Sequence, residues 1–264
     1  MTTATETDRW SPGGEPRTWD DHSVDCGNCL HRDLLESGNC QLGRACVCDR
    51  YAPRLDRFFR QNPELASQYF SHPYFEVRAI AANYADISSL PWLVGDVDET
   101  VRAIVALRLP HFLLPKLRED PHREVRIRVA SRLEGKDLAA MAEDPDYYVR
   151  IVVARRLDPS FLSLMMNDSD PEVRRIVARR IWANQLEGMV ADPEATVRLE
   201  VARRLMPRLL AYLQCDSDWR VRYEVARRVS ESRIEAMLDD PDELVRELVH
   251  TRLSSPQPWE TEQD

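Results

Sequence analysis

The sequence has very little glycine and almost no lysine. Only 8 of its 264 residues are glycine, and five of these lie within the first 43 residues. No G-x-G-x-x-G and no G-x-x-x-x-G-K-[ST] motif occurs, so the loops that bind phosphates in nucleotide-dependent enzymes are missing. Of 36 basic residues only Lys116 and Lys136 are lysines. Positive charge is therefore carried by guanidinium groups, which suit paired contacts.

Long apolar segments are absent as well. No stretch of 18 apolar residues occurs, and Met1 to Asp25 lacks the basic-then-apolar pattern of a secretory signal. We therefore expect a cytoplasmic protein with no membrane partner. The sequence shows no paired carboxylates, no nucleophile elbow and no Ser-His-Asp arrangement, so we also expect that it is not an enzyme.

A 24-residue repeat fills the C-terminal three quarters of the chain. Eight valines recur at this spacing without an insertion, and each is followed by arginine. Apolar residues four and eight positions after the valine complete one stripe of a helix. In five repeats an aspartate three positions before the valine is a favourable helix N-cap. The valines are Val77, Val101, Val125, Val149, Val173, Val197, Val221 and Val245, and the aspartates are Asp98, Asp146, Asp170, Asp218 and Asp242.

A second, shorter apolar element follows each predicted helix. Leucine, isoleucine or methionine recurs 13 and 16 residues after the first seven valines, as at Leu90 and Leu93. A first helix of about three turns leaves roughly five to seven residues, which suits a 3-10 helix or a single helical turn. Each unit has one apolar side, so residues 73–253 are predicted to stack into an all-α solenoid of eight repeats with one continuous core.

The ends of the repeat region differ from its middle. Arg54 lies 24 residues before Arg78, and residues 51–72 are therefore predicted to form a degenerate capping repeat. An alanine lies five residues after the valine in seven repeats, but His250 replaces it in the last, as expected of a cap that faces water. Residues 1–25 and 254–264 are polar and are expected to be flexible tails.

Two series of arginines run through the repeats. An aspartate, such as Asp216, recurs five residues before seven of the valines. Each repeat can therefore offer one carboxylate to an arginine that follows a valine, which predicts a structural ladder of Asp-Arg pairs. The second series lies six and seven residues after the valine. Two interpretations stay open for it: a solvated face balanced by nearby acidic groups, or a basic track. The candidate binding residues of this track are Arg155, Arg179, Arg203 and Arg227.

The partner of such a basic track is inferred from its composition. Guanidinium groups could bind an acidic protein or nucleic-acid phosphates. No aromatic residues interleave with the arginines, so stacking of single-stranded bases is not favoured and an acidic protein partner is preferred. We expect the protein itself to be a monomer.

A cysteine-rich module precedes the repeats, at residues 26–50. Five of the six cysteines lie in it, and in a reducing compartment such a group indicates a metal rather than disulfides. Four thiolates bind either zinc or an iron-sulfur cluster. A zinc ribbon usually closes with a second Cys-x2-Cys, whereas the second half is spread wider here, which slightly favours the bulkier cluster and leaves zinc as the alternative. The five are Cys26, Cys29, Cys40, Cys46 and Cys48.

Five thiols compete for four ligand positions. Cys46 and Cys48 are two residues apart, and we favour Cys46 as the ligand. Gly43 offers a flexible turn after Cys40, and residues 49–51 resemble the start of a helix directly after Cys48.

Three other potential ligands lie outside this set. His22 and His31 could bind a metal, but we expect them to be surface histidines. Cys215 lies within the repeats and is expected to be an unligated structural thiol.

The order of these motifs resembles a known family. Cys26-Gly-Asn-Cys29, then Cys40 to Cys46, then Asp49-Arg50-Tyr51 and the Val-Arg repeats are similar to the leucine-rich-repeat-variant iron-sulfur proteins of nitrogen-fixing bacteria, over nearly the whole chain. The resemblance implies a small N-terminal 4Fe-4S domain joined to a right-handed superhelix of alternating α and 3-10 helices. It implies association with nitrogenase-related genes but no defined activity. The ligands it implies are Cys26, Cys29, Cys40 and Cys46, while Cys48 lies outside the pattern.

These observations lead to one functional expectation and one alternative. We expect an iron-sulfur repeat protein that acts as a protein-binding scaffold, with a 4Fe-4S cluster for electron transfer or redox sensing and a link to nitrogen fixation. The alternative is a solenoid that binds nucleic acid through its arginine stripes and carries a structural metal site.

Overall fold

The structure is a computed structural model that describes residues 14–254. Within them the regular elements are α-helices and 3-10 helices, and the only β-type pairing is two isolated bridges, so the expected all-α fold is confirmed. These residues fall into two compact units. The first ends at Leu133 and the second begins at Glu134. None of the helices between residues 14 and 254 is long and apolar enough to cross a lipid bilayer.

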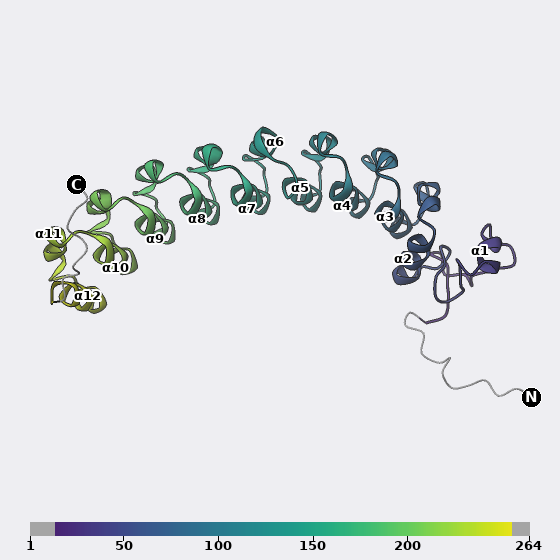
Figure 1. The fold of residues 1–264 in the computed structure, drawn as a ribbon, viewed down its shortest axis with the longest axis horizontal. Helices are drawn as coiled ribbons and strands as arrows, with labels where there is room; N and C mark the ends of the chain where they lie inside the picture. The colour runs from purple at the N-terminus through teal and green to yellow at the C-terminus, as the bar shows by residue number, and fades with distance from the viewer. Residues whose placement is uncertain (1–13, 255–264) are drawn as a thin grey trace, which may run out of the picture. The chain divides into compact units, whose positions relative to one another are not determined.

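The first unit contains one short helix followed by helix pairs. In each pair an α-helix precedes a shorter 3-10 helix, and Figure 1 shows α2, α3, α4 and α5 side by side in one layer. The elements are α1 (Arg32–Glu36), α2 (Ala52–Gln61), η2 (Pro63–Tyr69), α3 (Phe75–Tyr84), η3 (Ile87–Leu93), α4 (Glu99–Arg108), η4 (His111–Leu117) and α5 (Arg123–Ala130).

The second unit repeats the same alternation. Two places depart from it, since α6 stands where a 3-10 helix would follow α5, and α11 with η8 stands where one would follow α10. The elements are α6 (Gly135–Ala139), α7 (Tyr147–Arg156), η5 (Pro159–Met165), α8 (Pro171–Arg180), η6 (Ala183–Met189), α9 (Ala195–Arg204), η7 (Pro207–Leu213), α10 (Trp219–Arg228), α11 (Glu231–Ile234), η8 (Glu235–Met237) and α12 (Glu243–Ser254).

Each repeat folds as its periodicity predicts. The Asp170 side chain accepts hydrogen bonds from the backbone N–H groups of Glu172 and Val173, and thereby caps α8. Val173, Val177 and the alanine that follows, Ala178, are fully buried, and α8 packs on α9. The small side chain lets α8 and α9 approach closely. The exposed His250 agrees with its predicted place in the last repeat.

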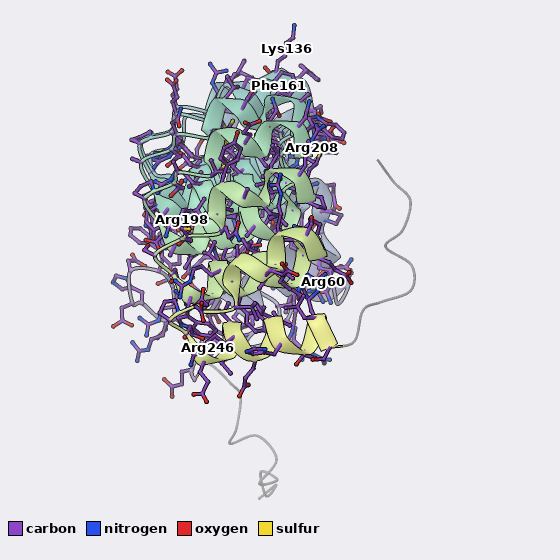
Figure 2. All side chains as sticks on the ribbon, turned by 90° about the vertical axis from the view of Figure 1, so that its left-hand side faces the viewer. Arg60, Lys136, Phe161, Arg198, Arg208 and Arg246 are labelled. Carbon is purple, nitrogen blue, oxygen red and sulfur yellow. The ribbon has the colours of Figure 1, made fainter. Side chains whose placement is uncertain are left out.

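The predicted Asp-Arg ladder is confirmed. In the second unit, Arg198 donates two hydrogen bonds to Asp216, at 2.6 and 2.7 Å, and a third to the Asp192 carbonyl at 2.8 Å. Figure 2 shows Arg198 and Arg246 of this series on one side of the ribbon and Phe161 and Arg208 of the 3-10 helices on the other. Such buried forks fix the register of neighbouring repeats. The pairs within each unit are Arg78–Asp96, Arg102–Asp120, Arg150–Asp168, Arg174–Asp192, Arg198–Asp216 and Arg222–Asp240.

The arginines seven residues after the valine have a structural role that the sequence did not indicate. Arg204 donates to the carbonyl oxygens of Ala178 and Ile181, at 2.7 and 2.8 Å. These oxygens lie at the C-terminal end of α8, where carbonyls lack helical partners and carry partial negative charge. Arg180 and Arg228 contact the preceding helix in the same way. This half of the second series is therefore neither a solvated face nor a basic track.

The chain before the repeats folds onto them. Helices α2 and η2 form a helix pair that packs on α3. Arg54 takes the place of the repeat arginine and donates to Asp49 at 2.8 Å and to the Gly14 carbonyl at 2.7 Å. Residues 14–25, which the sequence assigned to a tail, therefore belong to the folded module. Residues 1–13 and 255–264 of the predicted tails lie outside the described residues.

Candidate metal centre

The first two cysteines lie in a turn that an aspartate organises. Asp25 accepts a hydrogen bond from the Gly27 N–H at 2.8 Å and one from the Asn28 amide at 2.7 Å. This side-chain cap bends the chain between Cys26 and Cys29, both of which are half-buried.

The remaining three cysteines follow α1 in a loop with a tight turn. Gln41 and Ala45 exchange backbone hydrogen bonds, both at 2.8 Å, and so close the turn that separates Cys40 from Cys46. Gly43 has φ 74°, a left-handed conformation that glycine adopts without strain. The turn predicted at this glycine is present.

The five thiols of the module lie within electrostatic range of one another. Hydrogen bonds from the Cys40 and Cys48 thiols lower the pKa of Cys46, and the backbone N–H groups of Cys48 and Asp49 assist. The same contact raises the pKa of Cys40, and burial adds to it. The Cys48 thiol contacts both Cys46 and Cys29, which raises its pKa. Burial, followed by the charges of Cys46 and Cys29, raises the pKa of Cys26.

This donor set fits a thiolate-bound centre. All five groups are sulfur, which binds zinc and iron-sulfur clusters. Backbone N–H groups point at two of the sulfurs: His31 N–H donates to Cys29 Sγ at 3.4 Å, and Cys46 accepts the two described above. Across residues 14–254, no three His, Cys, Asp or Glu side chains already take the close arrangement that a single metal ion requires.

Aromatic side chains of α2 and η2 pack against His31 of the cysteine module. His31 Nε2 is hydrogen-bonded to the Tyr69 hydroxyl of η2, and its ring packs on Phe58 at 5.5 Å between centroids. Burial and the charges of nearby thiols, Cys48 first among them, raise the pKa of Tyr69. Phe58 and Phe59 are fully buried on α2. His22 is exposed, as expected, but the expectation of a surface position is wrong for His31, which is half-buried. Its partner Tyr69 lies 38 residues further along the chain, so no local sequence pattern indicated the contact.

Comparison with known proteins agrees with this architecture. Residues 16–68 match a family described as "LRV protein FeS4 cluster". A solved structure described as a leucine-rich repeat variant with a novel repetitive structural motif is 43% identical, with a TM-score of 0.79, and the alignment covers 87% of this chain and 98% of that one. The chain belongs to the leucine-rich repeat variant family. It is an iron-sulfur repeat protein by both matches.

A curated relative is similar to this leucine-rich repeat variant over part of its length. It is a 27.7 kDa uncharacterized protein in the nifB 3' region of Rhodobacter capsulatus, 51% identical over 98 residues. The match covers 37% of this chain and spans 40% of the relative's length.

The leucine-rich repeat variant carries its four candidate binding arginines in the second unit. Arg155, Arg179, Arg203 and Arg227 are exposed on α7 to α10. Arg179 and Arg203 both pair with the buried Glu200, at 2.5 and 3.2 Å, so one carboxylate offsets two guanidinium groups. Arg227 pairs with Glu224 at 2.9 Å. The positive charge of this stripe is therefore partly neutralised from within.

The sequence predicted a thiolate site but not the residues that surround its thiols. Cys26, Cys29, Cys40 and Cys46 are brought together with Cys48, while Cys215 is an exposed thiol of the second unit. The contacts of Cys48 could have been expected from the Cys-x-Cys spacing, which keeps its thiol within reach of Cys46. No local signal indicates Tyr69.

Proposed function

We propose that this protein is an electron-transfer scaffold rather than an enzyme, with a 4Fe-4S cluster held in residues 26–50. The observation that carries the proposal is that one short segment holds five thiols within electrostatic range, with backbone N–H groups that donate to Cys29 and Cys46. When bound, such a cluster supplies one-electron redox chemistry. Redox sensing would use the same chemistry with a different readout.

The proposed ligands are Cys26, Cys29, Cys40 and Cys46. Cys40 and Cys46 are buried, whereas Cys26 and Cys29 are half-buried in the Asp25 turn. The N–H donors at Cys29 and Cys46 would offset thiolate charge and so favour the reduced state. The Phe58 and Phe59 rings on α2 are fully buried, and His31, whose N–H donates to Cys29, packs on Phe58. Electron exchange is therefore expected at the side facing solvent.

Cys48 is proposed as a supporting residue rather than a ligand. Its N–H donates to Cys46, a contact made by the backbone that survives replacement of the side chain. Cys46→Ser and Cys48→Ser form a matched pair, because both remove one thiol from the same loop. We expect Cys46→Ser to lose the cluster and Cys48→Ser to retain it; the reverse outcome would make Cys48 the fourth ligand.

The decisive experiment is elemental and spectroscopic analysis of anaerobically purified protein. We expect about four irons and four sulfides per chain, with visible absorption and a paramagnetic resonance signal that appears on reduction with dithionite. One zinc per chain and no colour would make the module a structural clamp. A cluster that decomposes on reduction would exclude electron transfer.

We further propose that the repeats bind an acidic protein partner through Arg155, Arg179, Arg203 and Arg227. The support is their exposure and the sharing of Glu200 by Arg179 and Arg203, which leaves excess positive charge there. The locus of the similar Rhodobacter capsulatus protein favours a partner in nitrogen fixation. Deleting the gene in its host and measuring growth on dinitrogen tests that link, and unchanged growth would remove it.

A specific observation keeps nucleic acid as the second candidate. Tyr147 and Tyr148 on α7 and Trp219 on α10 are exposed on two of the helices that carry these arginines, and exposed rings can stack on bases. Nucleic-acid binding predicts affinity that falls steeply with salt and is lost in Arg155→Glu with Arg227→Glu. No binding to DNA or RNA at low salt would exclude it.

A further inference from the structure

The cysteine module and the helix pair that follows it, residues 14–68 together, contain two arginines without an acidic partner. Seven arginines lie in residues 14–68, and five of them have a carboxylate within 4.0 Å. No carboxylate partner is found within the described residues for Arg44 or Arg57. The five paired arginines are Arg17, Arg32, Arg50, Arg54 and Arg60.

The two unpaired arginines line the same cavity. Arg44 lies in the tight turn closed by Gln41 and Ala45, and Arg57 lies on α2. Arg57 Nη1 donates to the Arg44 carbonyl at 3.4 Å, which brings the two residues together. The cavity has a volume of about 530 Å³, and its remaining lining residues are Gly38, Gln41, Ala45 and Gln61. No acidic side chain is among them, so two guanidinium groups and two amides face a space without a counter-charge.

The cavity adjoins the proposed cluster ligands. The turn that lines it runs from Gln41 to Ala45, directly between Cys40 and Cys46. A partner that seats an anion here would lie one short turn from two buried thiols. Leu42, at the tip of the turn, is also exposed and offers an apolar contact beside the charges.

We propose that this cavity is the docking site for carboxylates of an acidic redox partner protein, and this rests on the proposed electron-transfer function. Guanidinium forks bind carboxylates in a bidentate manner, and the amides of Gln41 and Gln61 add donors. No aromatic residue lines the cavity, so nucleic-acid bases have nothing to stack on. An acidic protein surface presents several carboxylates at once, which gains affinity through multivalency that a single small anion lacks.

The binding test uses the full-length holoprotein and a fluorescein-labelled oligoglutamate peptide at low salt. We expect Arg44→Glu with Arg57→Glu to weaken binding about tenfold or more, because charge complementarity governs such encounters. Arg32→Glu with Arg60→Glu is the matched control. It makes the same charge change at two exposed arginines of residues 14–68 that do not line the cavity. Arg44→Lys with Arg57→Lys keeps the charges and should retain most of the binding, which separates charge loss from misfolding.

Four binding results would overturn the proposal. They are unchanged affinity in the cavity variant, equal weakening in the control, loss only in Arg155→Glu with Arg203→Glu, and tighter Arg44-dependent binding of a single-stranded RNA than of oligoglutamate. The third would move the acidic partner to the repeats, and the fourth would replace it with nucleic acid.

A redox test links the cavity to the cluster. Dithionite-reduced protein is oxidised in a stopped-flow instrument by ferricyanide, an anion, or by hexaammineruthenium(III), a cation. We expect the Arg44→Glu, Arg57→Glu variant to be oxidised by ferricyanide about tenfold or more slowly than the Arg32→Glu, Arg60→Glu control. Its rate of oxidation by hexaammineruthenium(III) should not fall. Equal rates in the two variants would overturn the cavity as the site of exchange. A cluster that cannot be reduced, with oligoglutamate binding still dependent on Arg44 and Arg57, would refute the electron-transfer function while the anion site stands.

Discussion

Removing Arg222 should destabilise the second unit far more than removing its near neighbour Arg220. Arg222 donates to both carboxylate oxygens of Asp240, at 2.8 and 2.9 Å, and to the Asp216 carbonyl at 2.7 Å. Its side chain is 10% exposed and that of Asp240 is 5% exposed. Arg222→Ala leaves that buried carboxylate without its fork, and breaking such a pair on one side costs about 3–5 kcal/mol.

Arg220 is the matched control on the same helix. It pairs with Asp218 at 2.6 Å, but its side chain is 50% exposed. Water screens this pair, so Arg220→Ala should lower the free energy of unfolding far less than Arg222→Ala does. Replacing both members of the buried pair, with Arg222→Met and Asp240→Asn, should cost less than the sum of the single changes, because no buried charge is then left unpaired.

The assay is urea unfolding followed by circular dichroism, with amide hydrogen exchange of α10 and α12. Hydrogen exchange is included because a repeat array can open locally without global unfolding. A cost for Arg222→Ala below about 1 kcal/mol, equal to that of Arg220→Ala, would refute the reasoning that burial decides the contribution of the pair. Additive single changes in the double variant would refute the pairing itself.

Three further predictions follow from individual contacts. Burial alone would raise the pKa of Asp240, but hydrogen bonds from Arg222 and the Asp242 N–H hold it below the ordinary value of 3.8. The contribution of this carboxylate to the free energy of unfolding is therefore complete above about pH 4 and is lost as the pH falls through the lowered pKa. Urea titrations between pH 5 and 2 should show this loss in the wild type, and a loss of the same size in Arg222→Ala would contradict it. Arg204→Ala should cost about 1.5–3 kcal/mol because two helix-end carbonyls lose a charged donor, whereas the exposed Arg203→Ala should cost less; equal midpoints in urea would refute the capping role. Tyr69→Phe should speed the release of iron to a chelator, whereas Tyr84→Phe, which removes a hydroxyl bonded to Asp56 away from the thiols, should not; equal release rates would exclude a clamp at His31.

The two adjacent arginines in each repeat show where sequence periodicity stops being informative. Arg203 and Arg204 share a residue type, a neighbourhood and a 24-residue period. Successive residues on an α-helix point about 100° apart, so Arg203 faces solvent and Glu200, while Arg204 faces the carbonyls of the preceding helix. Only the stacking of one repeat on the next separates the two roles.

The metal module shows the same division. The spacing of the cysteines predicted a thiolate site, because five soft donors within one short segment favour a metal over disulfides in a reducing compartment. Their hydrogen bonds, the contact of Cys48 with Cys29 and the His31–Tyr69 bond depend on which loops pack against α2 and η2. The cavity at Arg44 and Arg57 depends in the same way on which arginines find a carboxylate in the folded chain.

The repeat, its two helix types, the aspartate caps and the Asp-Arg ladder could all be predicted from the sequence. Each of these depends on spacing that recurs in register, and stacking similar units repeats the same local preference along the chain. Which arginines stay exposed, which thiols meet and which cations lack a carboxylate became clear only in the folded chain. Those outcomes depend on contacts between residues far apart in the chain, for which the sequence has no local signal.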